Sequence, residues 1–503
     1  MGTNVKYGPW ISDQGDGTFR NPVLYADYSD PDVIRVGDTY YMTASSFNCT
    51  PGLPVLVSKD LVNWQLIGHG IKNVPHPRYT ECQPGCGVWA PSIRYHQGIF
   101  YIVFPMPDEG LYVISSEDPF KGWSEPWLLL EGKGLIDPCP FWDEDNKAYV
   151  VHGYAYSRAS IKSKLHLIEV SPDLKNVLSE GQTIIDAMGR IHTLEGPKMH
   201  KENDYYYIAA PAGGVPQGYQ MVFRSKNIFG PYEEKIVLSQ QGSLTNGPHQ
   251  GAFVDDIEGK WWFYHFQDLQ PWGRINHLQP VQWIEDWPIP GVDPDGIKGG
   301  RPVQRYNKPA GESIIIQPAD SDDFSTESLG LQWQWNANHG EDWYQQEKGL
   351  LTLKGTTLDT KFSLYPRILT QKINAPHYQA IVALRPSQDF VHGEAGLCIT
   401  GLESYRLGMS WEDGTYYLLY STDENVLLKE AIDWTDKVDL FVEMNKGGLC
   451  RFGYFLGLQK NYFGPSFRAK EGRWIGTRFG LYCYSNNEQE VKADFMSVNI
   501  NKG

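Results

Sequence analysis

Short runs of aromatic and β-branched residues, separated by polar turns, recur along the chain as far as Glu285. Each copy begins with a polar or small residue, usually followed by proline, and continues as a short strand, a turn and an aromatic strand. The five copies begin at Asp30, Ala90, Asp137, Glu195 and His249. Units of about 50 residues with three or four strands are typical of propeller blades. We therefore predict a five-bladed β-propeller over residues 20–317; the alternative is a β-sandwich with chance similarity among its hairpins.

The pattern changes after a polar stretch at residues 311–325, and we place a domain boundary near residue 318. Short alternating runs follow, for example at residues 350–354, 378–384 and 438–444. They predict an antiparallel β-sandwich of about ten strands over residues 318–503. Trp333 and Trp335 alternate with polar residues, as in a strand that is buried on one face.

Composition supports an all-β protein and argues against several other classes. The chain has 30 Tyr, 21 Phe, 17 Trp, 51 Gly and 33 Pro, a mixture suited to strands and tight turns. Lys and Arg number 44 against 60 Asp and Glu, a net charge of −16 that argues against nucleic acid or an anionic membrane as partner. Mean hydropathy is −0.42. No apolar run approaches the length that a transmembrane helix needs, so we expect no such helix.

Cysteine usage and the first residues leave the cellular compartment open. The seven cysteines do not form a disulfide scaffold, and Cys82 and Cys86 lack the second pair that a zinc site would need. The opening Met-Gly-Thr-Asn-Val-Lys has no apolar signal core. Either the protein is cytoplasmic, or an export signal has been removed; we favour a secreted or periplasmic protein.

The predicted propeller brings three carboxylates together. The innermost strand of every blade begins at the central axis, so the first residues of the repeats form one ring. Asp30, Asp137 and Glu195 would then share a small space, although like charges repel one another and resist desolvation. A single Asp-Pro is usually a turn at the start of a strand, but three carboxylates at equivalent positions indicate function. Two opposed carboxylates are the groups that hydrolyse glycosides, and a third can raise the pKa of the acid.

Side chains suited to sugars accompany the ring. Phe47, Trp89, Trp272 and Arg274 lie near the ring openings, where aromatic faces and a guanidinium could bind a sugar. Each aromatic residue taken alone could instead belong to the core, and Arg274 alone could be a surface ion pair.

Several motifs resemble glycoside hydrolase family 43, and the resemblance covers essentially the whole chain. In the propeller they are Asn21-Pro-Val-Leu, Ser29-Asp-Pro-Asp-Val-Ile-Arg, Gly87-Val-Trp-Ala-Pro-Ser-Ile, Ile136-Asp-Pro, Leu194-Glu-Gly-Pro and Pro280-Val-Gln-Trp. The second domain, including Leu329-Gly-Leu-Gln-Trp-Gln-Trp-Asn, resembles the concanavalin-like domain of family β-xylosidases. In such relatives this domain packs on the propeller and helps to close the pocket; a passive stabilising or sugar-binding module is the alternative.

The resemblance implies an inverting mechanism with assigned residues. Asp30 would be the general base, Glu195 the general acid, and Asp137 the residue that adjusts the pKa of the acid. Phe47, Trp89 and Arg274 would line the sugar subsite. His249 would support the site, near a calcium ion or a water cluster in some relatives. No cofactor or metal is required by this mechanism, and a structural calcium remains an open alternative.

The sequence thus predicts an exo-acting hydrolase that releases terminal β-D-xylose or α-L-arabinofuranose, or both, from plant cell-wall poly- or oligosaccharides. The stretch Gly273-Arg-Ile-Asn-His lacks the acidic residue that many relatives have after the arginine, which leaves the choice of sugar open. The alternatives are an endo-arabinanase and a non-catalytic carbohydrate-binding propeller. The expected partner is a pentose-containing saccharide, with neither nucleic acid nor a membrane.

Overall fold

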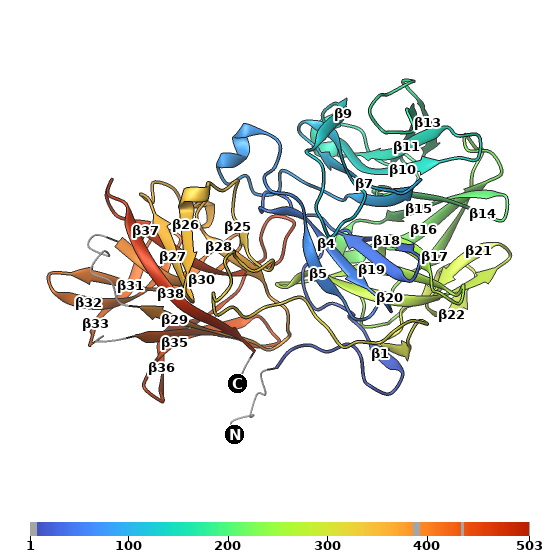
Figure 1. Cartoon of the computed structure of the whole chain (residues 1–503). Coiled ribbons are helices and arrows are strands. Elements are labelled where there is room, and N and C mark those ends of the chain that lie inside the picture. Colours follow the sequence, from blue (N-terminus) through green and yellow to red (C-terminus); the bar gives the residue numbers. More distant parts are fainter. Residues whose placement is uncertain (1–7, 386–392, 434–436, 502–503) are drawn as a thin grey trace.

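A ring of five β-sheets and a two-sheet sandwich lie side by side in the computed structural model, which describes residues 8–385, 393–433 and 437–501 (Figure 1). The predicted all-β architecture, a five-bladed propeller followed by a concanavalin-like sandwich, is confirmed. Helical segments are short and lie in connections. They are α1 (Tyr156–Ala159), η1 (Pro77–Thr80), η2 (Val215–Gln217), η3 (Glu341–Trp343) and η4 (Phe362–Leu364).

Each blade contains four antiparallel strands that are hydrogen-bonded in chain order. The first two blades are β2 (Asp32–Val36), β3 (Thr39–Thr43), β4 (Gly52–Ser58) and β5 (Gln65–Ile71), then β6 (Ser92–His96), β7 (Ile99–Met106), β8 (Gly110–Ser116) and β9 (Trp127–Glu131). The third is β10 (Leu135–Trp142), β11 (Ala148–Tyr154), β12 (Lys164–Val170) and β13 (Gln182–Asp186). The last two are β14 (Lys198–Glu202), β15 (Tyr205–Ala212), β16 (Tyr219–Ser225) and β17 (Glu233–Leu238), then β18 (His249–Asp255), β19 (Trp261–Leu269), β20 (Gly273–Ile284) and β21 (Trp287–Pro290).

Added strands and a buried amide join the two ends of the propeller. β23 (Gly299–Arg301) and β22 (Val292–Asp295) extend the fourth sheet, and β1 (Thr18–Arg20) pairs with β24 (Arg305–Asn307). The Asn21 side chain donates hydrogen bonds to two backbone carbonyls, each at 2.9 Å, one in β20 and one shortly before β24. The segment around Asn21, shortly before the first blade, is thereby fixed to the last blade.

Apolar side chains fill the space between neighbouring blades. Val55, Ile93 and Ile102, from the first two blades, belong to one buried cluster, and similar clusters separate the other blades. Alternating aromatic and β-branched residues suit this packing, because each sheet buries both of its faces against its neighbours. The polar groups at the strand starts are left free to face the centre.

The described residues of the second domain form two sheets of seven strands each. One contains, in spatial order, β25 (Gln334–Trp335), β28 (Leu369–Lys372), β37 (Arg478–Ser485), β30 (Gly393–Thr400), β31 (Tyr405–Glu412), β32 (Thr415–Thr422) and β33 (Val426–Ile432). The other contains β26 (Tyr344–Glu347), β27 (Leu350–Gly355), β38 (Val491–Ile500), β29 (Tyr378–Arg385), β34 (Val438–Met444), β35 (Leu449–Leu456) and β36 (Gln459–Arg468). The expected count of about ten strands was therefore too low. Edge strands such as β33 and β36 are largely exposed, so they lack the alternation that would reveal them.

Backbone hydrogen bonds connect the two domains. The amide of Thr50 donates to the carbonyl of Trp335 at 3.1 Å, and the amide of Trp335 donates back at 2.6 Å. Trp333, Gln334 and Trp335 are all buried, so the expectation of a strand buried on one face was wrong. This short strand is covered on its second face because the propeller packs against it.

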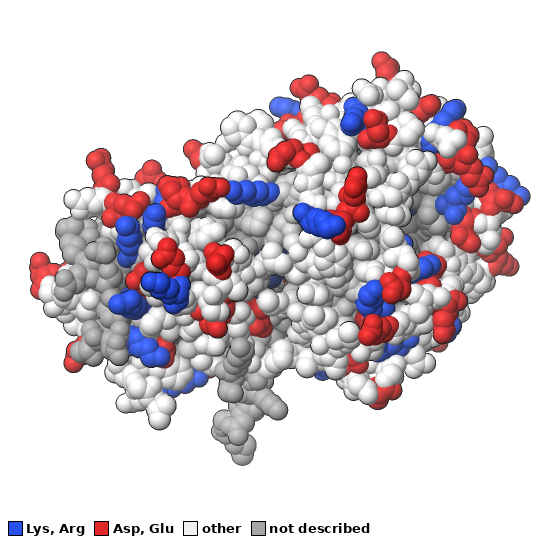
Figure 2. All heavy atoms as spheres, in the orientation of Figure 1, with Lys and Arg blue, Asp and Glu red and all other residues white. Residues whose placement is uncertain are grey.

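The face of the molecule shown in Figure 2 has no stripe of basic residues, in keeping with the acidic composition. Figure 2 shows Lys and Arg side chains mixed with Asp and Glu side chains over both lobes. Nucleic-acid binding usually requires basic residues gathered on one face. Among the described residues, no helix is long and apolar enough to cross a membrane. All seven cysteines are free thiols.

Candidate active site

A cavity of ≈ 110 Å³ collects most of the predicted site residues. Its lining consists of Asp30, Phe47, Trp89, Ala90, Ile136, Asp137, Glu195, Val215, Gln250, Arg274 and Trp474. The three carboxylates thus come from the starts of the first, third and fourth blades and face one space. Trp474 is the only one of these residues that belongs to the sandwich.

The backbone at the ring positions has an unusual conformation. Asp30, Asp137 and Gln250 have φ values of 54°, 56° and 54°, and Gly196, directly after Glu195, has a φ of 60°. Left-handed backbone at a non-glycine residue costs on the order of 1 kcal/mol or more and concentrates at functional sites. Four of the five blades therefore have left-handed backbone at the ring residue or directly after it.

Two hydrogen bonds hold the Asp30 carboxylate. Its Oδ1 accepts a hydrogen bond from Arg274 Nη1 at 2.7 Å, and its Oδ2 accepts one from Ser45 Oγ at 2.6 Å. Both Asp30 and Arg274 are buried, so the ion pair is shielded from solvent. With both oxygens occupied, the carboxylate has a fixed orientation toward the cavity.

Glu195 and Asp137 are a coupled pair with raised pKa values. Burial, followed by the charge of Asp137, raises the pKa of Glu195 to about 8. Burial, followed by the charge of Asp30, raises the pKa of Asp137 to about 7, although Asp137 Oδ2 accepts a hydrogen bond from the Gly196 amide at 2.7 Å. That amide favours the charged form of Asp137, and no hydrogen bond to the Glu195 carboxyl is made by the described residues. We therefore assign the shared proton mainly to Glu195.

Three aromatic side chains line the cavity next to the carboxylates. The ring centroids of Phe47 and Trp89 are 6.3 Å apart, and those of Trp89 and Trp474 are 6.4 Å apart. Phe47 has a φ of 52° and pairs with Val88 across an isolated bridge. A Cβ at Gly87 would lie 2.3 Å from the Phe47 carbonyl oxygen, so only glycine permits this approach.

The sandwich contributes the loop between β36 and β37, and Asp27 fastens that loop to the propeller. Asp27 Oδ1 accepts a hydrogen bond from the Arg274 amide, and Oδ2 accepts one from the Gly476 amide, each at 2.9 Å. Ser29 Oγ also donates to Oδ1, at 2.8 Å. One buried carboxylate thus connects the strand that carries Arg274 to the loop that carries Trp474.

His249 and Trp272 do not line the cavity. The Nδ1 of His249 lies 2.7 Å from the Gly247 carbonyl oxygen, and burial lowers the pKa of His249 to about 4. The next residue, Gln250, lines the cavity instead, because the strand register shifts between His249 and Gly251. Trp272 is buried between the domains and donates from Nε1 to the Ala375 carbonyl at 2.9 Å.

Sequence reasoning missed Val215, Gln250, Asp27 and Trp474. Gln250 could have been found by placing the turn residue, and not the residue before it, on the ring. Trp474 lies in a loop of a different domain and carries no repeat signal. Among the described residues, no group of three or more His, Cys, Asp or Glu side chains is placed to hold a metal ion.

Two family models match separate parts of the chain. The model of glycosyl hydrolases family 43 matches residues 19–288, and that of the beta xylosidase C-terminal concanavalin A-like domain matches residues 321–501. A putative beta-xylosidase of Xylanibacter ruminicola is 43% identical over 93% of this chain and 86% of its own length. A non-reducing end alpha-L-arabinofuranosidase of Bacteroides ovatus is 29% identical over 84% of this chain and 79% of its own length.

A solved structure supports the fold over nearly the whole chain. The bifunctional GH43-CE protein of Bacteroides eggerthii superposes with a TM-score of 0.85 at 28% identity, covering 99% of this chain and 64% of that protein. The first family model alone matches more than half of the 503 residues. The chain therefore belongs to glycosyl hydrolases family 43.

Proposed function

We propose that this glycoside hydrolase removes single terminal pentoses from the non-reducing ends of plant cell-wall oligosaccharides. β-D-xylose is the first candidate for the released sugar and α-L-arabinofuranose the second. One observation carries the proposal: three carboxylates and Arg274 line a small cavity that has an aromatic wall from each domain. A pocket walled by both domains suits a chain end, whereas an endo-acting enzyme needs a cleft that is open at both ends. Names of relatives favour xylose and keep arabinose as the second candidate.

In the proposed mechanism the three carboxylates have separate roles. Glu195 carries the proton of the coupled pair at neutral pH and donates it to the leaving oxygen. Asp30, oriented by Arg274 and Ser45, accepts a proton from the attacking water. Asp137 holds negative charge beside Glu195 and thereby keeps the pKa of the acid high. Attack by water on the face opposite the leaving group would invert the anomeric carbon.

The cavity supports recognition of a small uncharged sugar ring. Phe47, Trp89 and Trp474 offer apolar faces, and the Arg274 guanidinium and the Gln250 amide are able to hydrogen-bond hydroxyl groups. His249 then serves to support Gln250 from behind the lining. We also retain the proposals of a secreted or periplasmic location and of no required cofactor, with a structural calcium near His249 as the alternative.

The test is hydrolysis of nitrophenyl β-D-xyloside, nitrophenyl α-L-arabinofuranoside, xylo-oligosaccharides and linear arabinan. We expect turnover of at least one nitrophenyl pentoside, free pentose as the first product from oligosaccharides, and an α-anomer from a β-xyloside when the reaction is followed by NMR. Release of oligomers from arabinan would support the endo-acting alternative. Binding of xylo-oligosaccharides without turnover of any substrate would support the non-catalytic alternative.

A further inference from the structure

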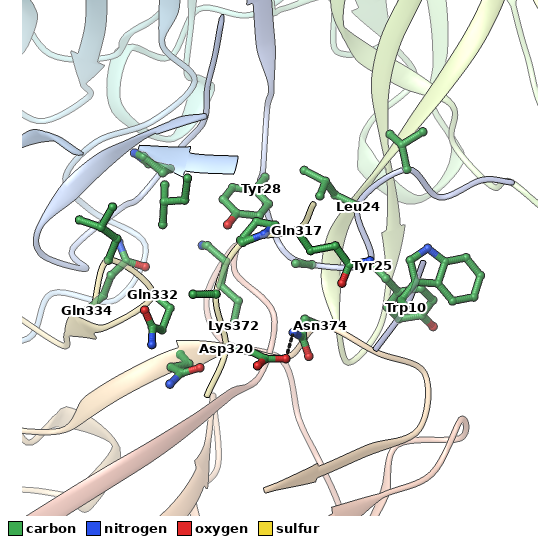
Figure 3. Close-up of a pocket in the computed structure, with 18 of the residues that line it drawn as sticks. Trp10, Leu24, Tyr25, Tyr28, Gln317, Asp320, Gln332, Gln334, Lys372 and Asn374 are labelled. Carbon is green, nitrogen blue, oxygen red and sulfur yellow. Dashed lines mark hydrogen bonds between the residues drawn. The ribbon is translucent and has the colours of Figure 1, made fainter. Parts of the chain in front are cut away.

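A second cavity lies at the junction of the two domains (Figure 3). The segment before β2, the connection at residues 317–320 and the sandwich strands β25 and β28 contribute to its walls. Its lining includes Trp10, Tyr25, Tyr28, Asp320, Gln371 and Lys372. Its volume of ≈ 50 Å³ is enough for about three to five water molecules, since each needs roughly 10–15 Å³ on this measure. A ligand group of acetate size would fit.

Two basic residues meet beside this cavity. Lys372 in β28 is the direct cross-strand partner of Arg478 in β37. Adjacent cross-strand side chains lie on the same face of a sheet, and like charges in this arrangement are destabilising. Arg478 is 4% exposed, whereas Lys372 is only partly buried and borders the cavity. Burial and the charge of Arg478 lower the pKa of Lys372 to about 8.

Neither basic residue has a carboxylate partner among the described residues. Arg478 donates to two neutral acceptors, Thr370 Oγ1 and Gln334 Oε1, each at 2.8 Å. The ammonium group of Lys372 makes no hydrogen bond within the described ranges and lies 5.0 Å from the centroid of the Tyr28 ring. A buried charge without a counter-charge is costly, and Arg478, the buried member of the pair, has only neutral acceptors among the residues that the structure describes.

The nearest carboxylates already have other partners. Asp320 lines the cavity, but its Oδ1 accepts from Ser321 Oγ at 2.9 Å and its Oδ2 accepts from Asn374 Nδ2 at 3.1 Å (Figure 3). Asp27 attracts Lys372 electrostatically, yet three donors near the active site occupy its oxygens. Neither carboxylate lies within ion-pair distance of Lys372 or Arg478 in the described chain. Among the described residues, Lys372 and Arg478 therefore have no direct ion-pair partner at the cavity, although the charges of Asp320 and Asp27 lie nearby.

A further hydrogen-bond donor at the cavity lacks an acceptor. The Tyr28 hydroxyl donates to no described residue, and in Figure 3 it faces the same space as the Lys372 ammonium. A carboxylate has two oxygens and about four lone pairs, and so could accept from an ammonium and a hydroxyl together.

We propose that the interdomain cavity is a binding site for a small carboxylate, with Lys372 as its counter-charge. Trp10 and Tyr25, whose ring centroids are 5.2 Å apart, border the same cavity and offer an apolar surface to the rest of the ligand. The source is either a free small acid such as acetate or the carboxylate of a sugar acid. Binding would join β28 of the sandwich to the Tyr28 segment of the propeller and stabilise the domain junction.

The experiment is calorimetric titration of the full chain with sodium acetate, sodium glucuronate and sodium chloride at constant ionic strength, with thermal unfolding measured in parallel. We expect saturable binding of at least one carboxylate and, at ten times its Kd, a rise in Tm on the order of 1 °C. If glucuronate binds more tightly than acetate, the ligand is a sugar acid. If acetate binds as tightly as glucuronate, the ligand is a free small acid. Either result supports the site.

Two variants and a matched control locate the binding. Lys372→Met should weaken carboxylate binding at least about tenfold, and Tyr28→Phe, which removes only the hydroxyl, about threefold. Lys446→Met, at an exposed lysine of the same domain, should leave binding unchanged.

Three results would overturn the proposal. The first is no binding by the wild type up to 100 mM, which is roughly 25 times an expected Kd of about 4 mM. The second is equal stabilisation by chloride and acetate. The third is binding that appears only in Asp320→Asn. The last would show that Asp320 is the counter-ion of Lys372. No substrate is used in this titration, so its outcome is independent of the proposed hydrolase activity.

Discussion

The propeller and the sandwich supply the active-site cavity in different ways. The propeller contributes Asp30, Asp137 and Glu195 from equivalent points of repeated units, and each is fixed by the turn at the start of a blade. To the cavity lining the sandwich contributes only Trp474, from the loop between β36 and β37. The three carboxylates therefore come from the repeated units of the propeller, whereas a single loop of the sandwich closes the cavity. Changes in the propeller ring should reduce kcat, whereas changes in the sandwich loop should mainly raise KM.

The largest effect is expected at Asp30. Asp30→Asn keeps the shape and leaves one oxygen for a hydrogen bond, but it removes the proton acceptor and half of the ion pair with Arg274. We expect kcat to fall about 10²–10⁴-fold on nitrophenyl pentosides and oligosaccharides alike, because water must be activated in both cases. Steady-state kinetics measure this. Asp145→Asn, at an exposed site on the third blade, is the control; near-normal turnover by folded Asp30→Asn would remove Asp30 as the base.

Glu195 should show a loss that depends on the leaving group. Glu195→Gln cannot donate a proton, so hydrolysis of a disaccharide should fall about 10²–10⁴-fold. A nitrophenolate leaves without protonation, and its release should fall less than about tenfold. Comparing kcat on the two substrates measures the difference. Equal losses on both would mean that the proton donor is another group in the cavity.

Asp137 tests the coupling between carboxylates. The Asp137 charge raises the pKa of Glu195, so Asp137→Asn should lower that pKa. The acid then loses its proton at lower pH, and the alkaline limb of the pH–rate profile should move down by about 1 unit, with about tenfold less activity near that limb. A pH profile of kcat/KM measures it. An unmoved limb would contradict the coupling.

The same contrast explains what could be predicted from the sequence. Asp30, Asp137 and Glu195 could be placed together because repeats of similar length put equivalent residues at equivalent points. His249 shows the limit of that reasoning, because a one-residue shift at the strand start places Gln250 in the cavity in its stead. The repeat length varies from blade to blade, so the sequence does not fix the ring position to a single residue. Trp474 could not be predicted, because its position depends on how two domains dock. The exposed strands β33 and β36 were missed because alternation reports burial on one face.

The sandwich side of the comparison is tested first at Trp474. Trp474→Ala removes one aromatic wall, which contacts the propeller through Trp89 and is 40% exposed. We expect KM to rise about tenfold, a loss of about 1.4 kcal/mol, with kcat reduced much less. Trp411→Ala, at an aromatic residue of the same domain outside the cavity lining, is the control. A fall in kcat as large as that of Asp30→Asn would mean that the loop helps to organise the carboxylates.

The smallest effect is expected at Asp27, which joins the two sides without lining the cavity. Asp27→Asn retains one oxygen, enough to accept from the Arg274 amide, but places an NH₂ group where Oδ2 accepted from the Gly476 amide. The Gly476 amide then lacks its acceptor, and the Trp474 loop is held less tightly. We expect KM to rise about threefold, in the same direction as in Trp474→Ala and by less, because the tryptophan is still present. The double variant Asp27→Asn/Trp474→Ala should have the KM of Trp474→Ala alone, since a looser loop has no further effect once its side chain is gone. The two increases in KM could instead multiply in the double variant, or kcat could fall with KM unchanged. Either result would mean that Asp27 acts through Arg274 and the propeller, and that its bond to the sandwich loop does not close the cavity.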